Sequence, residues 1–308
     1  MPPRNTLEVE VDGRTMALTN LDKVMYPAVG FTKGQVIDYY TRVAPYMLPH
    51  LRERPLTLKR YPNGVDDKFF YEKNCPKHRP DWVRTVPVWS RHNDANIEFC
   101  VVDDLATLVW LAQLACLELH TSMAYATDPA HPTIMVFDLD PGPGTDVLDC
   151  SRVAIWLRDI FDHLDLQSFP KTSGSKGLQV YVPLNVPGVG YEPGTKSFAR
   201  ACAELLERQH PDHVVSKMSK DLRKDKVFVD WSQNDEHKTT VCVYSLRAKE
   251  RPTVSTPVTW EEVEDALEAE DPDMLVFDSA DVLERVEEHG DLFAPVVELQ
   301  QELPKLGG

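Results

Sequence analysis

The chain lacks any long hydrophobic run. No stretch of its 308 residues approaches the roughly 20 consecutive apolar residues that a membrane-spanning helix requires. The N-terminal segment MPPRNTLEVEVDGR also lacks the apolar core of a signal peptide. These two absences argue against an integral membrane protein and predict a cytoplasmic protein with no membrane partner.

Paired cysteine motifs are also absent. No CxxC occurs, and most of the six cysteines lie in apolar segments: Cys75, Cys100, Cys116, Cys150, Cys202 and Cys242. We therefore expect reduced, buried thiols. The segment CPKH, Cys75 to His78, has the spacing of a zinc half-site, but no matching second half follows, so we expect no structural zinc.

Several nucleotide-handling signatures are missing. The chain has neither the GxGxxG fingerprint of dinucleotide-binding proteins nor the GxxxxGK[ST] loop of P-loop enzymes. It also has no KxDG motif, which carries the adenylated lysine of a ligase. These absences argue against a dehydrogenase, a P-loop enzyme and a ligase.

Negative charge is plentiful but unevenly distributed. The formal net charge is −16, yet residues 261–308 hold 16 acidic residues against Arg285 and Lys305, a net of −14, which leaves −2 for the first 260. Within that nearly neutral part, basic clusters occur at LRERPLTLKRY and SKMSKDLRKDK. Such clusters can contact phosphates locally, so the overall acidity does not exclude nucleic acid as a partner.

Hydrophobic periodicity and turn residues predict an α+β protein. Strands come in pairs separated by single helices, which favours mixed or antiparallel sheets flanked by helices over a doubly wound parallel sheet. The predicted elements are a hairpin over 9–19 that turns at Asp12-Gly13, helices over 32–48, 105–120, 147–164 and 195–209, strands over 56–62, 133–140, 178–184, 227–231 and 240–247, helices in the acidic segment, and a long polar loop over 63–82.

An aspartate pair on a predicted buried strand is the most informative feature. In TIMVFDLD, Asp138 and Asp140 leave the same face of the strand, with Cα atoms roughly 6.5 Å apart. Two carboxylates there repel each other, and a divalent cation relieves the repulsion. Two cations about 3.5 to 4 Å apart can clamp the attacking and leaving oxygens of a phosphoryl transfer. The Asp-Pro-Gly that follows is also ordinary turn chemistry, so the pair alone leaves a structural role open.

Two further segments favour phosphate chemistry. In KTSGSKG, the glycines allow close backbone approach, Ser173 and Ser175 offer hydroxyls, and Lys176 offers a positive charge, a combination that suits a polyphosphate. In VFVDWSQN, Asp230 ends another apolar strand and can supply a third carboxylate. The three segments together predict a metal-dependent enzyme that transfers phosphate groups.

The same segments resemble the motifs of the archaeo-eukaryotic primase superfamily, and specifically the polymerase domain of bacterial DNA ligase D. The resemblance covers nearly the whole chain, through LTNLDKVMYP, TKGQVIDYY, RPLTLKRYPNG, FFYEKN, VFDLDPG, TSGSKGL, KVFVDWSQN and YSLR. It implies a primase-like fold with an RRM-like catalytic module in a single domain, 1–308. The expected parts are an N-terminal α/β part over 1–130, a catalytic sheet module over 131–255, and an acidic helical tail over 256–308 packed on it.

The resemblance also implies roles for individual residues. Asp138, Asp140 and Asp230 match catalytic carboxylates that hold two divalent ions, Mn²⁺ or Mg²⁺, with manganese favoured. A second set matches positions around the incoming NTP or dNTP: Lys59, Phe70, His120 (at the end of its predicted helix), Ser173, Lys176, Gln179, Arg223, Gln233 and Arg247. Phe69 and Phe70 match aromatics that stack on template bases, an interaction that tolerates any sequence.

The resemblance also covers two lysines, and the chain differs from the family pattern at one position. Lys23 and Lys33 match a pair that binds the 5′ phosphate at a DNA break or gap, where a helix N-terminus can assist them. The family's second motif usually ends in histidine, and here that place is Gln179. Glutamine keeps a neutral donor but cannot become a cation near neutral pH, which predicts lower nucleotide affinity or a lower catalytic rate.

The resemblance implies a template-directed primase-polymerase that extends DNA 3′ ends and fills gaps, with a preference for ribonucleotides, in double-strand-break end joining or gap repair. Expected partners are DNA with a 5′ phosphate, nucleoside triphosphates, Ku and an ATP-dependent DNA ligase. We expect a monomer associated with the bacterial nucleoid.

Two alternatives stay open at this point. Gln179 also fits a break-binding or synapsis module with weakened catalysis. The DxD strand fits a haloacid-dehalogenase-like phosphatase, although that family places Gly-Thr after the pair and this chain has Pro141.

Overall fold

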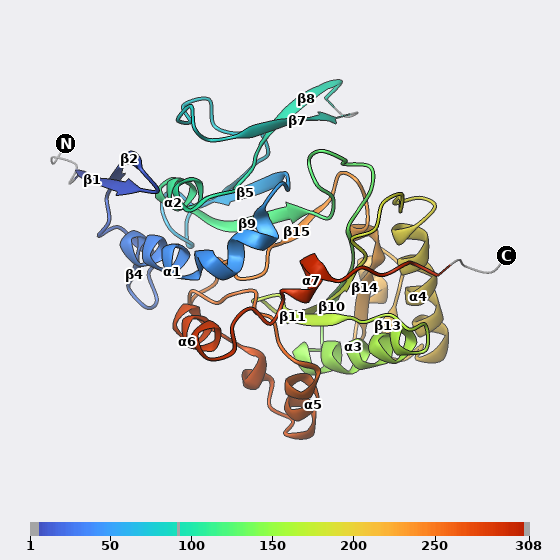
Figure 1. Cartoon of the computed structure of the whole chain (residues 1–308). Coiled ribbons are helices and arrows are strands. Elements are labelled where there is room, and N and C mark those ends of the chain that lie inside the picture. The colour runs from blue at the N-terminus through green and yellow to red at the C-terminus, as the bar shows by residue number, and fades with distance from the viewer. Residues whose placement is uncertain (1–5, 91–92, 305–308) are drawn as a thin grey trace. The chain divides into compact units, whose positions relative to one another are not determined.

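The structure is a computed structural model that describes residues 6–90 and 93–304 (Figure 1). The chain forms two compact units. Unit 1 runs to Thr121 and includes Val241–Val254 and Phe277–Gly290, and unit 2 holds Ser122–Thr240, Ser255–Val276 and the chain from Asp291 onward. Residues 1–5, part of the segment used above to argue against a signal peptide, lie outside the described residues. No helix in the described part of the chain is long and apolar enough to cross a membrane.

Unit 1 is built on a six-stranded sheet of order β15-β9-β5-β8-β7, with β6 also paired to β5. These strands are β5 (Leu56–Arg60), β6 (Phe70–Glu72), β7 (Thr85–Ser90), β8 (Ala95–Cys100), β9 (Cys116–Ser122) and β15 (Thr239–Val241), the last at the point where the chain passes from unit 2 to unit 1. The helices are α1 (Lys33–Leu51), α2 (Leu105–Gln113) and α6 (Ser279–His289), and α1 packs on both of the others. Two small hairpins complete the unit, β1 (Thr6–Val11) with β2 (Arg14–Thr19) and β3 (Val24–Tyr26) with β4 (Phe31–Thr32).

Unit 2 is built on a five-stranded sheet of order β11-β12-β10-β14-β13, antiparallel except for the parallel pair β13-β14. These strands are β10 (Ile134–Pro141), β11 (Phe169–Thr172), β12 (Leu178–Pro183), β13 (Val214–Val215) and β14 (Val227–Asp230). The helices are α3 (Val147–Asp162), α4 (Thr195–Gln209), α5 (Trp260–Glu268) and α7 (Pro295–Glu298), with short 3₁₀ turns η1 (Lys220–Leu222), η2 (Trp231–Gln233) and η3 (Pro272–Leu275).

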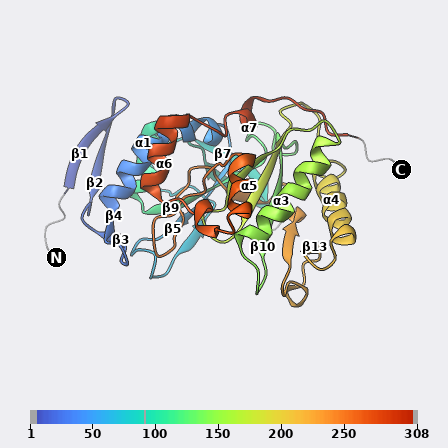
Figure 2. The same cartoon turned by 90° about the horizontal axis from the view of Figure 1, so that it is seen from below.

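Helices α3 and α4 lie side by side against the sheet of unit 2 (Figure 2). Phe137 on β10 packs on Phe161 of α3, with ring centroids 5.2 Å apart. Side chains alternate along a strand, so Asp138 and Asp140 leave the opposite face of β10 from Phe137. The core therefore anchors β10 from one side and presents its carboxylates on the other.

The predicted α+β class with antiparallel sheets is confirmed. The first hairpin turns at Asp12 and Gly13, whose φ angles of 50° and 71° are those of a two-residue hairpin turn. The helix predicted over 195–209 is observed as α4 with the same bounds. Asn234 adds a feature that periodicity cannot show, because its side-chain amide bonds both the N–H and the C=O of Val136 on β10.

The long helix predicted over 105–120 is wrong in its second half. Asp104 caps α2, which ends at Gln113, and Ala115 then adopts a left-handed φ of 58°. The chain continues as strand β9, on which His120 lies, and not at a helix end. Nearly every residue of CLELHTS is buried, so the apolar–polar alternation that identifies a strand is hidden.

Three other predicted boundaries differ from the structure. Helix α1 continues past Pro49 to Leu51, because its buried face at helical spacing compensates for the backbone hydrogen bond that proline cannot make. The predicted loop over 63–82 contains strand β6, which pairs with β5. The predicted strand over 240–247 ends at Val241, and Tyr244 adopts a φ of 65° in the turn that follows.

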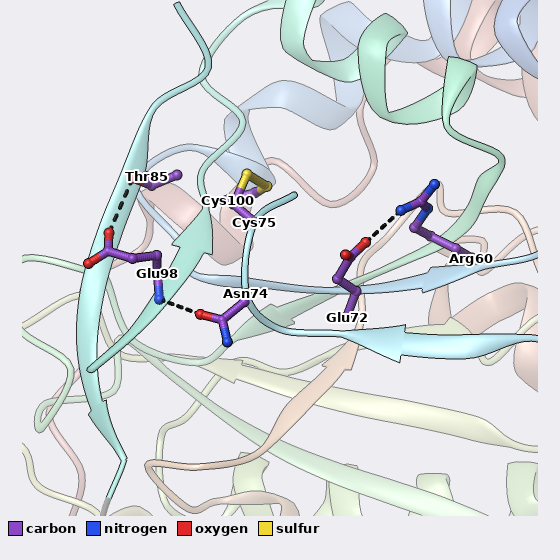
Figure 3. Close-up of a disulfide and its surroundings, with 7 residues drawn as sticks. All are labelled: Arg60, Glu72, Asn74, Cys75, Thr85, Glu98 and Cys100. Carbon is purple, nitrogen blue, oxygen red and sulfur yellow. Dashed lines mark hydrogen bonds and ion pairs between the residues drawn. A yellow bond between two sulfur atoms is a disulfide. The ribbon is translucent and has the colours of Figure 1, made fainter. Parts of the chain in front are cut away.

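The expectation of six reduced cysteines is wrong for two of them. Cys75 and Cys100 form a disulfide, drawn in Figure 3. Hydrogen bonds from the Cys75 N–H to the Glu98 carbonyl and from the Glu98 N–H to the Asn74 side chain hold the two segments side by side. The Cα atoms are 5.0 Å apart, a normal disulfide separation. The other four cysteines are free and buried, as predicted: Cys116, Cys150, Cys202 and Cys242.

Candidate active site

A row of polar residues crosses the sheet of unit 2. Asp138 on β10 lies opposite Gln179 on β12 and opposite Asp230 on β14. Lys171 on β11 lies opposite Gln179 on its other side. Directly opposed residues share a face of the sheet, so these four form one line, which we call the polar row. Asp140, two residues along β10, lies on the same face.

Hydrogen bonds connect the polar row from a buried lysine to a carboxylate. The Lys171 ammonium, fully buried, donates to Gln179 Oε1 at 2.6 Å and to Ser255 Oγ at 2.6 Å. Gln179 Nε2 donates to Asp138 Oδ1 at 3.0 Å and to Thr240 Oγ1 at 2.9 Å. Because a lysine ammonium only donates, it fixes the amide so that the NH₂ group faces Asp138.

Repulsion among the carboxylates is evident at Asp138. Burial, with the neighbouring charges of Asp140 and Asp230, raises the pKa of Asp138 to about 7, against the lowering effects of Gln179 and Lys171. An ionised carboxylate is therefore disfavoured at this position when no cation is bound. A divalent cation would reverse that preference.

Asp230 is held by the turn that follows it. Its Oδ1 accepts from the N–H and the hydroxyl of Ser232, and its Oδ2 accepts from Gln233 Nε2 at 3.1 Å. Within residues 6–90 and 93–304, no three His, Cys, Asp or Glu side chains are gathered as a metal site. The donors still fit a divalent ion of the Mg²⁺ or Mn²⁺ class, because three carboxylates share one face, although Asp230 would have to turn from its partners.

The KTSGSKG loop lies against the end of β10. A Cβ at Gly177 would stand 2.1 Å from the Leu139 carbonyl oxygen, so this approach requires glycine. The Ser173 hydroxyl accepts from the N–H groups of Ser175 and Gly177 and thereby shapes the loop. Lys176 at the loop tip is exposed. The structure thus brings the predicted polyphosphate loop beside the predicted carboxylate strand.

Arg223 is brought to the turn after β10. A Cβ at Gly142 would stand 1.7 Å from the Arg223 carbonyl oxygen, so the glycine that looked like turn chemistry is also required for packing. The guanidinium lies 3.7 Å from the centre of the Phe228 ring and donates to the Met218 carbonyl, while its Nε has no hydrogen-bond partner among the described residues.

Unit 1 carries the other predicted nucleotide contacts. Lys59 on β5, His120 on β9 and Arg247 all contact Glu118, a buried carboxylate that sequence reasoning did not select. We call these three residues the cation cluster. Burial lowers the pKa of His120 although Glu118 opposes the effect, so His120 is neutral at pH 7.

Exposed aromatic side chains lie on and beside β6. Phe69, Phe70 and Tyr71 are 49%, 42% and 60% exposed, and Tyr71 was not selected from the sequence. The Lys59 ammonium lies 4.6 Å from the centre of the Phe69 ring, and the Arg60 guanidinium lies 5.1 Å from that of Phe70. Rings held by cations on one side and open to solvent on the other can serve as a stacking surface.

The hairpin β3-β4 brings Lys23 and Lys33 together. The Lys33 N–H, in the first residue of α1, donates to the Lys23 carbonyl at 2.8 Å. The Lys33 ammonium donates to the Thr19 carbonyl, and that of Lys23 donates to the Pro62 carbonyl and to Asn63 Oδ1. Burial, with a smaller effect from the charge of Lys23, lowers the pKa of Lys33 to about 8.

The chain is similar in sequence and in fold to known proteins. The family described as LigD, primase-polymerase domain matches residues 32–293. The multifunctional non-homologous end joining protein LigD of Mycolicibacterium smegmatis is 42% identical over 283 residues, which cover 91% of this chain and 36% of that protein. The bifunctional non-homologous end joining protein LigD of Bacillus subtilis is 33% identical over 275 residues, covering 89% and 43%. The chain thus spans about two fifths of the length of these relatives.

A solved structure shares the fold. The polymerase domain of Mycobacterium tuberculosis ligase D, in complex with DNA, matches with a TM-score of 0.85 and 39% identity, over 93% of this chain and 99% of that one. The match leaves no basis for the phosphatase alternative. The chain therefore belongs to the family of LigD primase-polymerase domains, which are DNA-directed nucleotidyltransferases.

Proposed function

We propose that this chain is a template-directed polymerase that adds nucleotides to DNA 3′ ends and fills gaps, with a preference for ribonucleotides. The observation that carries the proposal is the register of unit 2, which puts Asp138, Asp140 and Asp230 on one face of the sheet. Two oxygen-bound cations need such a donor set. The two units act as one primase-polymerase domain, an inference supported by the family match, which includes parts of both.

The three carboxylates would hold two divalent ions, with Mn²⁺ preferred to Mg²⁺. Such ions, when bound, lower the pKa of an attacking hydroxyl and neutralise charge on the phosphates. Gln179, oriented by Lys171, donates to Asp138 and keeps its carboxylate in the polar row. Gln233 donates to Asp230 before any cation binds, and Asp230 would leave this hydrogen bond when it turns to hold an ion.

The remaining polar residues bind the nucleotide and the template. Ser173, Lys176 and Arg223 in unit 2 contact the triphosphate, as does the cation cluster in unit 1, because phosphate oxygens accept hydrogen bonds from hydroxyl and imidazole groups and more strongly from charged donors. Phe69 and Phe70 stack on bases. Cations and exposed rings on these segments support this assignment.

The relatives are named non-homologous end joining proteins, and this supports a proposal for the biological setting. We propose that the chain acts at bacterial chromosomal breaks or gaps, as a monomer in the nucleoid, beside Ku and an ATP-dependent DNA ligase. Lys23 and Lys33 bind the 5′ phosphate of the downstream strand.

A primer-extension assay tests the proposed activity. On a gapped duplex with a 5′ phosphate, Mn²⁺ and a nucleotide complementary to the template, we expect templated addition, faster with ribonucleotides than with deoxynucleotides. A chelator should stop the reaction. If no nucleotide is added with Mn²⁺ or Mg²⁺ while the duplex is still bound, the chain is a break-binding module and the polymerase proposal is wrong.

Binding of the 5′ phosphate should weaken as the pH rises. The pKa of Lys33 is lowered to about 8, so its charge is mostly present at pH 7 and mostly lost at pH 9. We expect affinity for a 5′-phosphorylated gap to fall about fivefold to tenfold over that range, measured by fluorescence anisotropy at constant salt. Lys33→Arg, which stays charged, should remove this dependence. Equal pH dependence on 5′-hydroxyl and 5′-phosphate DNA would contradict the assignment.

A further inference from the structure

Glu118 is a carboxylate that all members of the cation cluster contact. It lies on β9, opposite Lys59 on β5, and His120 follows at i+2 on the same face. Its side chain is 2% exposed, whereas those of Lys59, His120 and Arg247 are 13% to 16% exposed. A buried carboxylate thus lies beneath three partly exposed nitrogen-bearing side chains.

Both carboxylate oxygens of Glu118 are fully used. Oε1 accepts from Lys59 Nζ at 3.1 Å, the Tyr61 hydroxyl at 3.3 Å and the Ala248 N–H at 3.2 Å. Oε2 lies 3.0 Å from His120 Nε2 and 3.4 Å from Arg247 Nε. Against the opposing effect of burial, the His120 hydrogen bond and the charges of Arg247 and Lys59 hold the pKa of Glu118 well below its usual range, so it is a carboxylate at any working pH.

The Glu118 carboxylate also determines the position of the Lys59 ammonium group. Lys59 Nζ is held by Glu118 on one side and lies over the rings of Tyr61, Phe69 and Tyr71, at 5.3, 4.6 and 5.6 Å from their centres. Without Glu118, the charges of Lys59 and Arg247 would repel each other at close range. With Glu118 present, Lys59, Arg247 and Glu118 together carry a net charge of about +1, which suits an incoming polyanion.

We propose that Glu118 is a positioning residue that pre-organises the cation cluster for the triphosphate of the incoming nucleotide. The inference rests on the proposed function of the cluster. Glu118 contacts no phosphate itself. It holds three donors in place before the substrate arrives, so that less ordering is needed on binding.

Glu118→Gln is the main test, because it keeps the shape and removes the charge. An amide presents NH₂ in place of one oxygen, so either Lys59 or Arg247 faces a donor where it had an acceptor, and neither residue keeps a carboxylate charge beside it. In primer extension we expect KM for the nucleotide to rise at least about tenfold, with kcat changed by less than about threefold, the pattern of lost ground-state binding. The control is Asp104→Asn, a more exposed carboxylate of unit 1 that pairs with Arg14 and, among the described residues, contacts no member of the cluster.

A second measurement needs no nucleotide. In the free protein the pKa of His120, followed by NMR, should fall in Glu118→Gln, because the hydrogen bond and charge of Glu118 raise it in the native protein. If this pKa falls but neither protein adds nucleotides, the positioning role stands and the proposed function is wrong. If the native protein is active and Glu118→Gln leaves both KM and the His120 pKa unchanged, the positioning role is wrong.

Glu118→Asp separates positioning from folding. Aspartate keeps the negative charge on a side chain one methylene shorter. We therefore expect KM to rise less than in Glu118→Gln. The melting temperature should be similar to that of the native protein. Loss of the fold in both variants would overturn the inference, because Glu118 would then be required for the fold itself.

Discussion

We expect Asp138→Asn to abolish nucleotide addition and, in a chelator, to raise the melting temperature of the protein. The activity should fall by at least about three orders of magnitude, because asparagine supplies neither the charge nor the two oxygens that bridging cations require. The stability should rise because an ionised carboxylate is disfavoured beside Asp140 and Asp230, as the raised pKa of Asp138 indicates. We expect a gain of about 2 kcal/mol in the metal-free protein.

The control for this prediction is Asp235→Asn. Asp235 lies in the same unit and pairs with Lys196 at 2.7 Å, which, with neighbouring hydrogen bonds, lowers its pKa. Its replacement should lower stability slightly and leave extension intact, so the two asparagine variants should shift the melting temperature in opposite directions. A variant at Asp138 that melts below the native protein in a chelator, or that still extends primers, would show that the polar row has another role.

Lys171→Met should strongly destabilise the metal-free protein. The change removes the donor to Gln179 Oε1 and Ser255 Oγ, and it removes a buried positive charge that lowers the pKa of Asp138. Unsatisfied buried acceptors and an uncompensated carboxylate each cost about 1–3 kcal/mol, so we expect a loss of about 3 kcal/mol in chemical denaturation. Because a cation can replace the missing charge, saturating Mn²⁺ should raise the melting temperature of the variant more than that of the native protein.

The control for Lys171→Met is a lysine in a more exposed ion pair. Lys196→Met removes a lysine that is 27% exposed and pairs with Asp235, so its cost should be about 1 kcal/mol or less and independent of Mn²⁺. An equal Mn²⁺ response in Lys171→Met and the native protein would contradict an electrostatic role for Lys171. The lysine would then serve packing and amide orientation alone.

The sequence predicts those parts of the site whose signal is local. Asp138 and Asp140 can be placed on one face because a strand has a period of two, and Asp230 can be added because it also ends an apolar run. Gly177 can be assigned close backbone approach from its loop. At each of these positions, the local sequence segment is enough to predict where the residue lies in the site.

Lys171 and Glu118 could not be predicted, because their roles depend on register between strands. Lys171 resembles a loop lysine until β11 is paired with β12, and Glu118 resembles one polar residue in an apolar helix until β9 is paired with β5. The family resemblance named His120 and Gln179 but not the buried charges beneath them. The disulfide was missed for the same reason, since its cysteines lie 25 residues apart.

The disulfide between Cys75 and Cys100 means that exposure to oxidant or reductant changes the covalent structure of the protein. It joins the segment that follows β6 to the end of β8, and β6 carries the exposed ring of Phe70. Oxidised protein has four free thiols and fully reduced protein has all six. Samples handled with and without reductant are therefore different covalent species beside the exposed ring of Phe70, and their DNA-binding measurements can be compared only after their thiols have been counted.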